Sequence, residues 1–317
     1  MLDGFGEAKL MRWDDFRRSD NIEDNRDAGG FGGGYGGGGV GIPIGSGGLG
    51  IGTVIVLSLI GWALGINPSV LIGGAEIVSG GAPYQQEYRP SNRRVGTPSD
   101  PTGQFVAAVL GNTEDTWSDI FAASGREYRP PRLRLFAGGE LSGCGFAQAA
   151  MGPFYCPTDR RIYLDTSFFR EIETRFHGCQ GSVCKFSQAY VIAHEVGHHV
   201  QNLLGILPRA QAAQQTAGDR AAANRIQVRV ELQADCYAGI WANHSEQRRR
   251  FLDPGDIDAA LQTATAIGDD TLQRRARGSV VPDAFTHGSA EQRKRWFSIG
   301  FSQGRLSACD TFAAAQL

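Results

Sequence analysis

The sequence lacks three features that would assign it to common functional classes. Its formal net charge is only −2, which gives no argument for nucleic-acid binding. Its glycine-rich stretch contains no Gly-Lys-Ser or Gly-Lys-Thr and has no strand-to-helix context, so it is not a phosphate loop. The chain has no Cys-x-x-Cys pair, which argues against a zinc site built from cysteines.

Charged residues are also missing from the interval between Asp27 and Glu76. Glycine dominates residues 28–47, which predicts a flexible linker. Residues 48–66 are apolar over a length that suffices to cross a bilayer, and we predict one transmembrane helix there. The alternative is a buried core helix. A cleaved signal peptide is disfavoured because a long segment precedes the run.

Composition predicts the remaining boundaries. Residues 1–27 are polar and charged without a convincing buried face, which predicts a polar N-terminal tail. Residues 67–103, rich in Gly, Pro, Ser and Arg, predict a second linker. Residues 104–317 carry the apolar helix and strand patterns of one α+β domain, mostly helical with a small sheet. Basic residues in the tail slightly favour a cytoplasmic N-terminus, with the domain on the other side of the cell membrane.

All six cysteines follow the predicted membrane segment. An even number confined to the part that would be exported suits disulfides in an oxidising, extracytoplasmic compartment. The sequence leaves the connectivity open. We assign the pairs Cys179–Cys184, which closes a small loop, Cys144–Cys156 and Cys236–Cys309.

The residues His194-Glu195-Val196-Gly197-His198 form an H-E-x-x-H motif within an apolar helical stretch. Residues four apart share one face of a helix, so His194 and His198 can bind one Zn²⁺ through ring nitrogens. Glu195 lies one step round the helix and can act as general base on a metal-bound water. His199 points about 100° away from His198, which indicates a structural role.

A third ligand is expected on a second helix, predicted over residues 219–250. Glu231 and Asp235 are four apart within its apolar part. If buried, both carboxylates need a cation or hydrogen-bond donors. Glu231 would bind the zinc, and Asp235 would accept the second N–H of a ligand histidine. The alternative is a solvated acidic pair on a surface helix.

H-E-x-x-H followed by a helical E-x-x-x-D is the gluzincin arrangement, in which the third zinc ligand is a glutamate. The chain resembles the bacterial neutral zinc metallopeptidase family, which has one N-terminal transmembrane anchor. This resemblance implies a zincin-like fold and peptide hydrolysis, but no particular substrate. The matching stretches lie within about residues 104–317: 152–157, 162–165, 194–201, 231–238 and 285–293.

Two more parts of the domain are candidates for contact with substrate. His287 and Arg293 could stabilise the oxyanion that forms when water attacks the scissile carbonyl; the alternative is a loop histidine and a surface arginine. By analogy with zincins, residues 149–156 are the candidate edge strand, to which an extended peptide would add through main-chain hydrogen bonds.

The sequence therefore predicts a membrane-anchored zinc endopeptidase that acts on polypeptides. Its Zn²⁺ is held by His194, His198 and Glu231, with Glu195 as base. One alternative is a membrane-anchored binding or scaffold protein that zinc stabilises, although a structural site usually has four protein ligands. Another is a zinc amidase that acts on cell-wall peptides. Nothing in the sequence indicates the oligomeric state.

Overall fold

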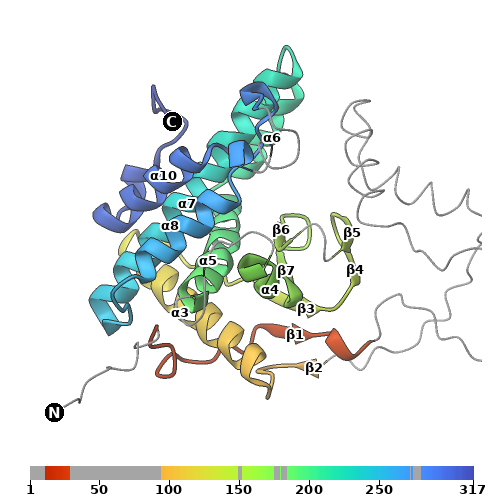
Figure 1. Ribbon diagram of the computed structural model, residues 1–317, viewed down its shortest axis with the longest axis vertical. Coiled ribbons are helices and arrows are strands. Elements are labelled where there is room, and N and C mark those ends of the chain that lie inside the picture. The colour runs from red at the N-terminus through yellow and green to blue at the C-terminus, as the bar shows by residue number, and fades with distance from the viewer. Residues whose placement is uncertain are drawn as a thin grey trace, which may run out of the picture.

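The computed structural model describes residues 11–28, 94–148, 152–174, 179, 184–271, 273 and 280–317. The predicted α+β class, mostly helical with a small sheet, is confirmed (Figure 1). The strands are β1 (Ile22–Asp24), β2 (Arg94–Val95), β3 (Arg132–Phe136), β4 (Gly139–Ser142), β5 (Gly145–Gln148), β6 (Phe154–Cys156) and β7 (Arg161–Asp165). The α-helices are α3 (Pro101–Ala123), α4 (Ser167–Thr174), α5 (Cys184–Leu203), α6 (Ile206–Gln215), α7 (Arg220–Arg249), α8 (Asp256–Ala266) and α10 (Ala290–Gln303).

Side-chain caps set where the main helices begin. Helix α3 begins at Pro101, because Asp100 accepts a hydrogen bond from the backbone N–H of Gly103. The long helix predicted over 219–250 is α7, and Asp219 caps it through the N–H of Ala222. At the start of α10, Ser289 and Gln292 form a capping box.

Small residues let three helices approach closely (Figure 1). A Cβ added at Gly197 of α5 would lie 3.0 Å from the carbonyl oxygen of Ala234 in α7. On the other side of α7, a Cβ at Gly300 of α10 would lie only 1.9 Å from the carbonyl oxygen of Cys236. Any larger residue at position 300 would push α10 away from α7.

The main sheet has the strand order β2-β1-β3-β7-β6. β3 lies at its centre and runs parallel to both β1 and β7, whereas β2 and β6 are antiparallel edge strands. The inner face of the sheet packs into the main core with the helices, through Ile22, Leu133, Leu135, Ile162 and Leu164.

The prediction that residues 1–27 have no buried face is wrong for the part that the structure describes. Met11, Phe16 and Ile22 are buried in the main core, with no more than 4% of any of them exposed. β1 is hydrogen-bonded between β2 and β3. Residues 11–28 are therefore part of the same packed unit as the predicted domain, and do not form a separate tail.

The predicted transmembrane helix at 48–66 and the linker at 28–47 fall almost entirely outside the described residues, as does most of the linker at 67–103. Among the helices that are described, none is long and apolar enough to cross a membrane. β1 precedes residues 48–66 and β3 follows them, yet the two strands pair directly. The single-pass transmembrane helix therefore stays a prediction, and the pairing shows only that β1 and β3 belong to one sheet.

The predicted disulfide pairs are all present: Cys144–Cys156, Cys179–Cys184 and Cys236–Cys309. The first ties the β4–β5 hairpin to edge strand β6. The third ties the C-terminal 3₁₀ turn η5 (Leu306–Cys309) to α7.

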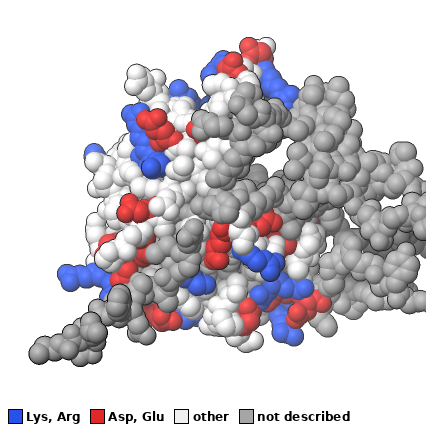
Figure 2. Space-filling view, viewed as in Figure 1, with Lys and Arg blue, Asp and Glu red and all other residues white. Residues whose placement is uncertain are grey.

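The outer face of the sheet carries a buried ion-pair network centred on Glu23 of β1. Its carboxylate pairs with Arg134 of the neighbouring strand and, at 3.0 Å, with Arg132. Burial alone would raise the pKa of Glu23, but these arginines lower it to about 2. Elsewhere on the described surface seen in Figure 2, acidic and basic side chains are interspersed, in keeping with the small net charge.

We predict that Glu23→Gln lowers stability in a pH-dependent way. A depressed folded-state pKa stabilises the fold above the unfolded value of about 4.5, and this contribution disappears as pH falls towards about 2. Urea unfolding at pH 7, 4 and 3 should therefore give a difference between wild type and variant that shrinks with falling pH. The control is Glu127→Gln, at an exposed side chain. A difference that stays constant with pH would contradict the assignment.

Candidate active site

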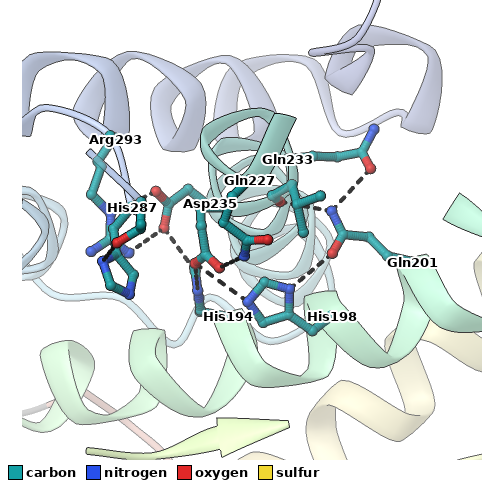
Figure 3. A network of polar contacts seen from close by, with 12 residues as sticks. His194, His198, Gln201, Gln227, Gln233, Asp235, His287 and Arg293 are labelled. Carbon is teal, nitrogen blue, oxygen red and sulfur yellow. Dashed lines mark hydrogen bonds and ion pairs between the residues drawn. The ribbon is translucent and has the colours of Figure 1, made fainter. Parts of the chain in front are cut away.

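Two crossing helices bring the predicted zinc ligands together (Figure 3). His194 and His198 lie one turn apart on α5, and Glu231 faces them from α7. One ligand atom from each residue lies within 4.8 Å of the other two. The three side chains are no more than 13% exposed. The cluster could therefore hold a metal ion shielded from bulk water.

The donor types of this cluster and its two carboxylate–histidine distances fit zinc. Glu231 Oε2 lies 3.3 Å from Nε2 of His194 and 3.5 Å from Nε2 of His198. Ligand atoms about 2.1 Å from a tetrahedral Zn²⁺ lie about 3.4 Å apart. The other carboxylate oxygen of Glu231 accepts a hydrogen bond from Gln227 Nε2 at 2.8 Å. Only Oε2 is therefore directed to the histidines, as in a monodentate ligand.

The buried carboxylates of the site need positive partners. Burial would raise the pKa of Glu231, but His198 and His194 hold it well below its usual range. Burial would lower the pKa of His194, whereas Asp235 and Glu231 raise it to about 10. A proton on His194 would supply positive charge to the two carboxylates, and zinc binding would release it.

Asp235 lies one turn beyond Glu231 and has no exposed side-chain surface. It accepts hydrogen bonds from His194 Nδ1 at 2.8 Å and from the Tyr190 hydroxyl at 2.5 Å. Arg293 of α10 donates to both of its oxygens, at 2.8 and 2.9 Å (Figure 3). This places Asp235 where the sequence predicted it, against Nδ1 of the predicted ligand His194. It also leaves Arg293 engaged and buried rather than facing the substrate.

Glu195 and His199 both connect α5 to the edge strand β6. Burial raises the pKa of Glu195 above its usual value. The neighbouring histidines and a hydrogen bond from the backbone N–H of Tyr155 act in the opposite direction, but they are the weaker effect. His199 is 1% exposed, and its ring nitrogens contact the Tyr155 hydroxyl at 3.1 Å and the Arg129 carbonyl at 2.6 Å. His199 thus has the predicted structural position, outside the metal cluster. Residues 149–151 of the candidate edge lie outside the described residues.

His287 lies beside the cluster in the loop before α10. Its side chain is 53% exposed, and Nδ1 lies 3.2 Å from Asp269 Oδ1. The other oxygen of Asp269 accepts the backbone N–H groups of Thr286, His287 and Gly288. Sequence reasoning missed Asp269, because no helical or strand periodicity connects it to a residue 18 positions away.

Comparison with known protein families identifies the family of this chain. A family model described as "Putative neutral zinc metallopeptidase" matches residues 11–312. The chain belongs to this family. The predicted resemblance is confirmed, and the family match also includes the N-terminal segment that carries β1.

Two relatives of the family illustrate its range among bacteria. The uncharacterized protein YpfJ of Escherichia coli strain K12 is 43% identical over 302 residues, which cover 95% of this chain and 99% of YpfJ. The uncharacterized protein Rv2575 of Mycobacterium tuberculosis strain H37Rv is 42% identical over 237 residues, which cover 72% of this chain and 76% of that protein. No solved structure matches the chain.

We predict that His198→Ala and His199→Ala differ sharply in zinc binding. Loss of a ligand should weaken zinc affinity by more than the 10–100-fold that is typical for loss of a ligand's hydrogen-bond partner, roughly 100-fold or more. His199→Ala should destabilise the β6 contact but keep wild-type affinity. Competition titration with a chromophoric chelator measures both. Equal affinities for the two variants would rule out His198 as a ligand.

Proposed function

We propose that the protein is a zinc-dependent endopeptidase that cleaves polypeptides. The supporting observation is a buried set of three zinc-type donors, His194, His198 and Glu231, with the buried Glu195 carboxylate next to His194 on α5. Three protein ligands leave the fourth position of a tetrahedral site open, as in catalytic zinc sites. A structural zinc site would be expected to have a fourth protein ligand, so the set favours an enzyme over a zinc-stabilised scaffold.

In the proposed reaction, bound Zn²⁺ would act as a Lewis acid and lower the pKa of the attacking water. The Glu195 carboxylate, one residue from His194 on α5, accepts a proton from this water. It then returns the proton to the nitrogen of the leaving amine. Asp235 keeps the His194 ring oriented through Nδ1, and Arg293 balances the charge of Asp235.

His287 is the proposed oxyanion donor. Of the two candidates from the sequence, Arg293 is 3% exposed and committed to Asp235, whereas the His287 side chain is half exposed. Asp269 holds Nδ1 of His287 and also the backbone of its loop. This leaves Nε2 as the nitrogen that can reach the developing negative charge on the substrate oxygen.

Edge strand β6 is the proposed guide for the substrate backbone. Among the described strands it pairs only with β7. Its residue Tyr155 is fixed to α5 through its hydroxyl, which accepts a hydrogen bond from Asn202 Nδ2 and contacts Nδ1 of His199. A peptide added along β6 would lie next to Glu195 and be held by main-chain hydrogen bonds. Such binding accepts many side chains, which suits an endopeptidase.

An oxidising, extracytoplasmic compartment is the proposed location. Three disulfides within the described residues would be reduced in the cytoplasm of most bacteria. The apolar run at 48–66 remains a candidate for contact with the cell membrane, with both flanking strands on the side of the domain.

We predict that Glu195→Gln keeps zinc and loses turnover, because the amide cannot accept the proton of the attacking water. The assay is hydrolysis of unfolded casein by the oxidised, zinc-loaded full chain, with zinc content measured in parallel. Chelator should abolish wild-type cleavage, and added zinc should restore it. Wild-type rates in the variant would exclude Glu195 as the base. Digestion of murein but not casein would favour the cell-wall amidase.

We predict that His287→Ala lowers kcat by about 100- to 1,000-fold with little change in KM, as for removal of one oxyanion donor. Asp269→Asn should lower kcat less, because the ring remains but is held less well. His244→Ala, which removes a histidine bonded to the Gly304 carbonyl, is the control and should keep full activity. An unchanged kcat in His287→Ala would remove this residue from the mechanism.

A further inference from the structure

The two ligand histidines are held in different ways. His194 contacts the Asp235 carboxylate, whereas Nδ1 of His198 contacts the uncharged side chain of Gln201, with 2.9 Å to Oε1. An ionised carboxylate can only accept hydrogen bonds. The ring nitrogen of a neutral imidazole that faces it must therefore carry the proton, which determines the tautomer. An amide can face the ring with either its oxygen or its NH₂ group. The tautomer of His198 therefore depends on what orients Gln201.

Two backbone carbonyls determine this orientation. Gln233 Nε2 donates to the carbonyl oxygen of Cys309 at 2.8 Å, which turns its own Oε1 towards Gln201. Gln201 Nε2 then donates to Gln233 Oε1 at 3.0 Å and to the carbonyl oxygen of Val230 at 2.8 Å. Both N–H groups of Gln201 are used in this way, so only its oxygen is available to His198. Figure 3 shows the three side chains in line.

Burial prevents water from replacing these bonds. Gln201 has no exposed surface, and Gln233 is 4% exposed. If the Gln201 amide were flipped, its oxygen would face the Val230 and Gln233 oxygens, and its NH₂ would face His198. The unpaired buried groups would make this arrangement unfavourable. Cys309 is itself held to α7 by its disulfide with Cys236.

We propose that this relay, from the Cys309 carbonyl through Gln233 and Gln201, fixes His198 in the tautomer that binds zinc. With Nδ1 protonated and donating to Gln201, the lone pair of Nε2 faces Glu231 and the metal position. Gln201 and Gln233 are positioning residues, and neither contacts the substrate in the proposed reaction. The inference rests on the proposed zinc centre.

The test is the zinc dissociation constant of the oxidised full chain, measured by chelator competition. Gln201→Met and Gln233→Met keep side-chain length but remove the hydrogen bonds. Gln201→Met should raise Kd about 10- to 100-fold, and Gln233→Met should raise it by a similar or smaller factor. Because Gln233 acts through Gln201, the double variant should match Gln201→Met alone. Unchanged Kd in either single variant, or factors that multiply in the double variant, would overturn the relay.

A matched control is Ser245→Ala on α7, the helix that carries Gln233, which removes a buried hydrogen bond from Ser245 to Asn112 of α3, away from the cluster. It should lower the melting temperature without changing Kd. A second measurement needs no variant: long-range ¹H–¹⁵N spectra of the zinc-loaded wild type should show His198 protonated at Nδ1. Protonation at Nε2 would overturn the proposal. Failure of wild type to bind zinc would instead contradict the zinc centre itself.

Discussion

Glu231 and Asp235 are buried one turn apart on the same face of α7, and much of the fold serves to compensate their charges. A buried carboxylate that loses its partner destabilises a protein by about 3–5 kcal/mol. The partners come from two other helices: the histidines from α5 and Arg293 from α10. Three helices must therefore pack closely and in one register. Glycines at the crossings, Gly197 and Gly300, remove the side chains that would prevent this.

The parts that could be predicted from the sequence are those with a local pattern. His194, Glu195 and His198 lie within one turn of a helix, and the same holds for Glu231 and Asp235. Helical periodicity alone was enough to put His194 and His198 on one face, with Glu195 next to it, and Glu231 and Asp235 on one face of the second helix. The caps at Asp219 and Ser289 are also local, since a cap and the N–H that it accepts are three residues apart. The sequence also predicts that the two sets meet, because Glu231 and Asp235, if buried, need a cation or hydrogen-bond donors.

The parts that could not be predicted depend on contacts between distant residues. β1 has three residues, of which Ile22 alone adds an apolar side chain to the inner face, so its segment is polar in composition. In the sequence, Glu23 looks like an exposed charged residue, and only the structure places Arg134 beside it. Asp269 and Gln233 act through partners on other elements. The pairing of β1 with β3 is likewise invisible in the sequence, because more than 100 residues separate the two strands.

The position of β1 also determines the order in which the molecule can assemble. The sheet has no continuous ladder from β2 to β3 until residues 22–24 are inserted between them. Residues 22–24 can pair with β2 once Arg94–Val95 has been synthesised, but their pairing with β3 must wait until Arg132–Phe136 has been synthesised. Closing so large a loop is slow compared with forming a helix. We expect the helical layer to form first and the N-terminal strand to complete the sheet as a late step of folding.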